Sequence, residues 1–142
     1  MTNDETNSHP KEQEKSLESA ANAHWKDLAP GLVRQRVVIE CTTPELVGPG
    51  EIKDYLVKLS QTVDMKPLSE PFAYPATGRD GTFMGWGGWL HWVTSGVHVY
   101  SYPTIPPLFT VDAYTCKPFS VDEAVEFTRD YFKTIEIVWK VP

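Results

Sequence analysis

From residue 32 onward, apolar positions recur in the patterns typical of strands and helices. Alternating, β-branched or aromatic runs predict strands over 32–41, 82–93, 97–102, 108–116 and 134–141. A further strand over 66–74 contains Pro67 and Pro71, and Pro75 follows it, which confines it to an edge or an irregular path.

Two segments have the spacing of amphipathic helices. In the first, over about 51–63, one face carries five apolar residues: Ile52, Tyr55, Leu56, Leu59 and Val63. The second opens at the capping box Ser120-Val-Asp-Glu123 and runs to about Phe132. The order strand, helix, about four strands, helix, strand predicts an α+β fold, an antiparallel β-sheet with two helices packed on one face.

The first 27 residues are polar and rich in Glu, Lys, Asn, Ser and Gln. We interpret residues 1–27 as a disordered polar tail, with a short helix over 14–25 as the alternative. Residues 28–142 are then a single domain, entered at the Pro30-Gly31 pair.

Composition narrows the function classes. The chain has 142 residues and a net charge of -6, so nucleic acid is not expected as a partner, because phosphate binding needs a basic face. No apolar run approaches the roughly 20 residues that cross a membrane, and the polar start is unlike a secretion signal. We therefore expect a cytoplasmic protein without a membrane partner, in which Cys41 and Cys116 are free thiols. No Cys/His cluster has zinc spacing, so no metal is expected.

The candidate chemistry begins at Thr94-Ser95-Gly96, which interrupts two strand-like runs. A serine before a glycine is most often a turn residue. A serine at a strained strand junction can also undergo an N-to-O acyl shift and elimination, which leaves a pyruvoyl group at a new amino terminus. That ketone condenses with a substrate amine and acts as an electron sink.

The segment Val93–Pro103, followed by Phe109–Cys116, resembles the small prokaryotic S-adenosylmethionine decarboxylases. Those enzymes have a cleavage serine, a strand ending in an aromatic-proline pair, and a strand of the type apolar-Asp-x-aromatic-Thr-Cys. The resemblance extends over roughly residues 32–140. It implies a pyruvoyl-dependent decarboxylase of polyamine biosynthesis that acts on S-adenosylmethionine or a related amino acid. It also implies a homodimer or higher homo-oligomer with active sites near the subunit interface.

The resemblance also assigns roles. Ser95 matches the pyruvoyl precursor, Cys116 the cysteine that protonates the decarboxylated carbon, and Phe83 falls near an aromatic that stacks on adenine. His98 and Tyr100, two residues apart and hence on one strand face, are candidates to assist processing. Candidate substrate-binding residues are Phe83, Trp92, Thr94 and Asp112.

Four positions depart from the family. Thr94 replaces a glutamate, Gly96 a histidine, Tyr100 the processing histidine and Gly87 a processing serine. Two alternatives therefore stay open. The uncleaved chain binds S-adenosylmethionine as a regulatory or binding protein, or it acts on a sulfonium substrate without a cofactor, with Tyr100, His98 or Asp112 as base.

Overall fold

The structure is a computed structural model that describes residues 24–142. Most of the predicted tail, and most of its alternative helix, lies outside the described residues. Residues 24–31 belong to a separate unit and contain no helix or strand, and the helices and strands among the described residues lie in the unit Leu32–Pro142. Within the described part, no helix combines the length and the apolar character needed to span a membrane.

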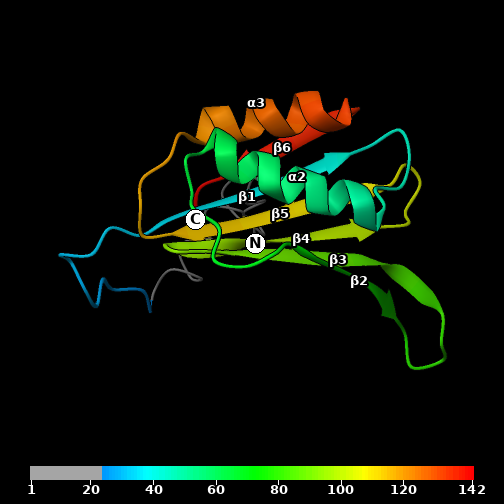
Figure 1. Cartoon of the computed structure of the whole chain (residues 1–142), viewed down its shortest axis with the longest axis horizontal. Helices are drawn as coiled ribbons and strands as arrows, with labels where there is room; N and C mark the ends of the chain where they lie inside the picture. The colour runs from blue at the N-terminus through cyan, green and yellow to red at the C-terminus, as the bar shows by residue number, and fades with distance from the viewer. Residues whose placement is uncertain (1–23) are drawn as a thin grey trace, which may run out of the picture. The chain divides into compact units, whose positions relative to one another are not determined.

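The helices and strands follow the predicted order (Figure 1). They are β1 (Gln35–Thr42), α2 (Pro49–Thr62), β2 (Phe72–Thr77), β3 (Phe83–Trp92), β4 (Ser95–Tyr102), β5 (Leu108–Thr115), α3 (Val121–Phe132) and β6 (Glu136–Lys140). All six strands form one antiparallel sheet in the order β2-β3-β4-β5-β1-β6. The predicted α+β fold class is confirmed.

β2 and β6 are the two edge strands of the sheet. The prolines correctly predicted an edge, but β2 begins at Phe72, later than predicted. Pro67 contributes only an isolated bridge, to Trp92. Pro75 is tolerated inside β2 because an edge strand needs only one set of ladder hydrogen bonds.

Alternating burial along the strands shows which face of the sheet the helices cover. In β4, Val97, Val99 and Ser101 are buried, whereas His98 and Tyr102 are exposed. The buried set packs with α2 and α3 into one core, and both helices lie on the same side of the sheet (Figure 1). We call the other side the open face.

The helix faces are those that the spacing predicted. Ile52, Tyr55, Leu56 and Leu59 of α2 are buried. In α3, the Ser120 hydroxyl accepts a hydrogen bond from the Glu123 N–H at 3.2 Å, so the predicted cap forms. The hydroxyls of Tyr55 and Thr128 lie 2.7 Å apart and tie the two helices together. Burial raises the pKa of the Tyr55 phenol, which therefore stays neutral within the core.

Tryptophans of β3 alternate between the two faces, as their spacing predicts. Trp86 packs against the core and Trp92 is buried within it, whereas Trp89 lies on the open face and stacks on Phe72 at 4.7 Å between ring centroids. The Trp92 indole Nε1 donates to the Ser60 hydroxyl of α2 at 2.7 Å.

Gly88 sets how closely α2 approaches β3. A Cβ at this position would lie 2.4 Å from Ile52 Cγ2 and 3.0 Å from the Phe72 carbonyl oxygen. Gly88→Ala should therefore lower the free energy of unfolding by about 1–3 kcal/mol through overpacking, measured by urea denaturation. The matched control is Gly50→Ala in α2, where no atom lies within 4 Å of the added Cβ. It should leave stability unchanged or raise it by up to about 1 kcal/mol. Equal effects of the two substitutions would contradict this account of the packing.

Candidate functional site

The β3–β4 hairpin contains the Thr94–Ser95 peptide bond, which is the candidate site of self-cleavage. Its turn consists of Val93 and Thr94, and Ser95 already pairs with Trp92 as the first residue of β4. The predicted turn at Thr94-Ser95-Gly96 is thus shifted by one residue toward the N-terminus. On its other side, Ser95 pairs with Thr115 of β5, which brings it beside Cys116.

The backbone on both sides of the Thr94–Ser95 bond is constrained. Ser95 has φ 135°, a conformation that favours glycine and is strained for a serine. The Thr94 carbonyl oxygen accepts a hydrogen bond from the Cys116 N–H at 2.9 Å. A fixed, polarised carbonyl therefore precedes a strained serine.

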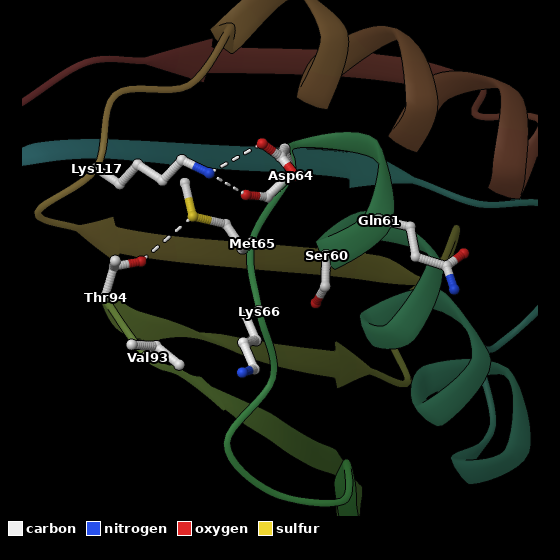
Figure 2. A pocket seen from close by; sticks show the side chains of 8 residues that line it. All are labelled: Ser60, Gln61, Asp64, Met65, Lys66, Val93, Thr94 and Lys117. Atoms are coloured by element: carbon white, nitrogen blue, oxygen red, sulfur yellow. Dashed lines mark hydrogen bonds and ion pairs between the residues drawn. The ribbon is translucent and has the colours of Figure 1, made fainter.

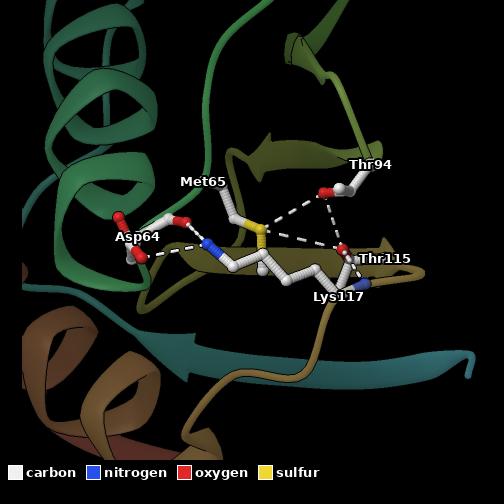
Figure 3. A network of polar contacts seen from close by, with 5 residues as sticks. All are labelled: Asp64, Met65, Thr94, Thr115 and Lys117. Carbon is white, nitrogen blue, oxygen red and sulfur yellow. Dashed lines mark hydrogen bonds and ion pairs between the residues drawn. The ribbon is translucent and has the colours of Figure 1, made fainter.

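A small polar network holds Thr94 from the side (Figure 3). The buried Thr115 hydroxyl donates to Thr94 Oγ1 at 2.9 Å and accepts from the Lys117 N–H at 3.0 Å. Thr94 Oγ1 in turn approaches the Met65 sulfur at 3.3 Å. The turn is thereby attached both to β5 and to the segment that follows α2.

Lys117 connects the same region to the end of α2. Its ammonium donates to the Asp64 carbonyl at 2.6 Å and to the Asp64 carboxylate at 2.9 Å. A cavity of about 530 Å³ lies here (Figure 2), lined by Ser60, Gln61, Asp64, Met65, Lys66, Val93, Thr94 and Lys117.

Ser95 lines a groove of about 520 Å³ with several side chains that can bind a ligand. His98 and Asp112 are direct cross-strand partners, and His91 pairs with Gly96. Trp89 and Tyr114 add aromatic surface to the same groove. Ser95, His98 and Asp112 of the predicted set therefore line one groove. His98 and Asp112 are on the open face, whereas Ser95 pairs with Trp92 and Thr115, whose side chains are buried on the core face.

Tyr100 shares a strand face with His98 but lies farther along β4, beside Tyr102 at 4.3 Å between rings. Desolvation raises the pKa of Tyr100, and the neighbouring phenols of Tyr102 and Tyr74 add to the effect. Its phenol is therefore protonated at neutral pH, suited to donating a proton rather than accepting one.

Two predicted substrate-binding residues lie away from the groove. Phe83 begins β3, at the opposite end from Trp92, and packs edge-on against Trp86 at 5.6 Å. Trp92 is only 2% exposed and its indole is already bonded to Ser60. Within one chain, neither side chain is available to a ligand beside Ser95.

His91 was not among the candidate residues predicted from the sequence, although it lines the groove with Ser95. The signal was the hairpin register, which puts His91 opposite Gly96 once the turn is set at Val93 and Thr94. Lys117 and Thr115 were also missed, because their contacts to Asp64 and Thr94 join segments distant in sequence.

Gly96 and Gly87 are two of the positions at which this chain differs from the resembling family, and at both a side chain would collide with a neighbouring strand. A Cβ at Gly96 would lie 2.8 Å from the Leu90 carbonyl oxygen, and one at Gly87 would lie 2.8 Å from the ring of Tyr74. Gly96 thus permits the close approach of β3 and β4, and Gly87 accommodates the Tyr74 ring.

The two cysteines differ in access. Cys41 is buried, and desolvation raises the pKa of its thiol to about 12, which makes it unreactive. Cys116 is exposed beside the hairpin. Among residues 24–142, no group of three or more His, Cys, Asp or Glu side chains is arranged to hold a metal ion.

Comparison with known proteins places the fold. No family model matches the sequence, and no curated protein matches it. The structure is similar to the crystal structure of the adenosylmethionine decarboxylase from Aquifex aeolicus, with a TM-score of 0.60 at 16% sequence identity. The match covers 78% of this chain and 89% of that chain. At this identity the similarity shows a shared fold, the one that the Ser95–Cys116 segment suggested.

The strain at Ser95 can be measured with two variants that both lack the hydroxyl. Ser95→Gly should be more stable than Ser95→Ala by about 1 kcal/mol, because glycine adopts φ 135° without a Cβ penalty. Chemical denaturation of the two variants measures the difference. A Ser95→Ala protein as stable as Ser95→Gly would show that the residue is unstrained.

Proposed function

We propose that the chain cleaves itself between Thr94 and Ser95 and is a pyruvoyl-dependent decarboxylase of S-adenosylmethionine or a related amino acid. The observation that carries the proposal is the geometry of that bond. A strained serine follows a carbonyl that is hydrogen-bonded by the Cys116 N–H, within a fold shared with an adenosylmethionine decarboxylase.

Self-cleavage would start when Ser95 Oγ attacks the Thr94 carbonyl carbon. Negative charge then develops on the Thr94 oxygen, where the Cys116 N–H at 2.9 Å stabilises it. Collapse breaks the C–N bond and leaves an ester, and the change relieves the strain at Ser95. His98 or His91, which line the same groove, are the candidate bases that take the hydroxyl proton and return it to the Ser95 nitrogen as the C–N bond breaks.

Loss of the Ser95 Cα proton would then eliminate the Thr94 carboxylate from Cβ. Hydrolysis of the resulting terminal enamine releases ammonia and leaves a pyruvoyl group. Both products stay within the sheet, because Thr94 remains attached to β3 and residue 95 pairs with β5.

The pyruvoyl group, once formed, supplies an electron sink for decarboxylation. The chain's own residues would bind and protonate. The exposed Cys116 thiol is the proton donor to the decarboxylated carbon. The Asp112 carboxylate in the groove suits a cationic sulfonium or ammonium substrate, and the rings of Trp89 and Tyr114 add apolar surface beside it.

Phe83 contributes to this proposal only through association of two copies. It lies at the end of β3 opposite to Trp92, so a second copy has to bring its Phe83 to the first copy's Ser95. Exposed aromatic rings on the open face, among them Phe72 and Tyr74, offer a surface for such a homodimer.

Mass spectrometry under denaturing conditions tests the cleavage directly. The expected result is two fragments, residues 1–94 and a pyruvoyl-started 95–142, and a Ser95→Ala chain that stays intact. An intact wild-type chain of 16.0 kDa would overturn the proposal.

A second candidate function is an uncleaved protein that binds S-adenosylmethionine. The close approach of β3 at Gly96 favours it, because a histidine there would collide with the Leu90 carbonyl oxygen. The histidine that the resembling family carries at this position therefore does not fit the hairpin as it is folded here.

Calorimetry with S-adenosylmethionine tests binding independently of cleavage. Intact Ser95→Ala protein should release or take up heat at sub-millimolar ligand, and adding Asp112→Asn should weaken binding about tenfold, because a charged contact to the ligand is lost. Absence of heat at millimolar ligand would contradict both candidate functions.

A further inference from the structure

The outer edge of β6 is exposed and carries both apolar and charged side chains. Among residues 24–142, β6 pairs with β1 alone, so no strand of this part of the chain occupies its other edge. Val138 is 54% exposed and Trp139 45% exposed, and Ile135 and Val141 at its ends are also exposed. An edge of this kind is a template for pairing with another strand.

The opposite edge of the sheet, formed by β2, is protected against pairing with a strand of another chain. Pro75 in the middle of β2 has no N–H to donate, and the register of β2 shifts between Ala76 and Thr77. Proline, bulges, short length and charged side chains are the usual devices that prevent edge pairing. β6 has no proline or bulge, and its only such devices are its length of five residues and the charges of Glu136 and Lys140.

The sequence of β6 is complementary to itself. It reads Glu136-Ile-Val-Trp-Lys140, with opposite charges at equal distances from Val138. In an antiparallel pair centred on Val138, each Glu136 lies opposite a Lys140, and each Ile137 opposite a Trp139. Opposite charges and large apolar side chains are both favourable cross-strand partners.

The two charges have the exposure that this pairing needs. Glu136 and Lys140 are both exposed and lie, with Val138, on the open face. Within residues 24–142, neither side chain forms one of the ion pairs found in this structure. Both are therefore available to a second chain.

We propose that β6 pairs antiparallel with β6 of a second copy of this chain, centred on Val138. The contact is isologous and closes after two copies, because the same edge is used by both. It joins two six-stranded sheets edge to edge. It does not depend on the proposed decarboxylase activity, and it uses a surface other than the aromatic rings of the open face.

Charge reversal tests the pairing with a built-in control. Lys140→Glu places glutamates opposite each other at two positions of the pair and should lower the mass measured by light scattering twofold at low salt. The double variant Glu136→Lys/Lys140→Glu restores complementarity and should restore the wild-type mass. Circular dichroism verifies that both variants fold.

Cross-linking tests the register. In a Cys116→Ser background, Val138→Cys should oxidise to a disulfide-linked pair, because the two cysteines lie directly opposite each other. Glu136→Cys should not, because its own counterpart lies several residues away. A folded Lys140→Glu protein with the wild-type mass, or equal cross-linking at the two positions, would overturn the proposal.

Discussion

Trp92 is the last residue of β3, and its indole lies in the core against α2. Its Nε1 donates to the Ser60 hydroxyl at 2.7 Å, and that hydroxyl donates to the Leu56 carbonyl at 2.6 Å. Because Trp92 also pairs with Ser95, the anchored indole fixes where β3 ends and where β4 starts. The tight turn, the positive φ of Ser95 and the carbonyl contact to Cys116 all follow from an end point that cannot shift.

The sheet divides the residues of β4 between two tasks. Val97 and Val99 fill the core, while His98 and Tyr100 belong to the other face. A strand that contributes to both has no freedom to slip, since a shift by one residue would bury His98 and expose Val99. The candidate chemistry therefore depends on the same alternation that builds the core. The helices packed on the core face hold β4 in place, and so they also fix the residues that line the groove at Ser95.

The sequence predicted correctly those features that are set within a single helix. Helix faces followed from spacing around Tyr55, and the cap at Ser120 followed from a local motif. The turn was misplaced because a positive φ is normally expected at glycine. Here Ser95 adopts it, and Gly96 serves a different need, the close passage of the Leu90 carbonyl. Burial of Trp92, the neighbours of His91 and the bond from Thr115 to Thr94 depend on pairing between strands, which no local pattern contains.

Gly96 limits which residues the β3–β4 hairpin can accept. The atom that a Cβ would meet at 2.8 Å is a backbone oxygen, which cannot rotate away as a side chain can. A side chain at this position would therefore have to push β3 away from β4, so the hairpin accepts a residue larger than glycine only if its two strands separate locally.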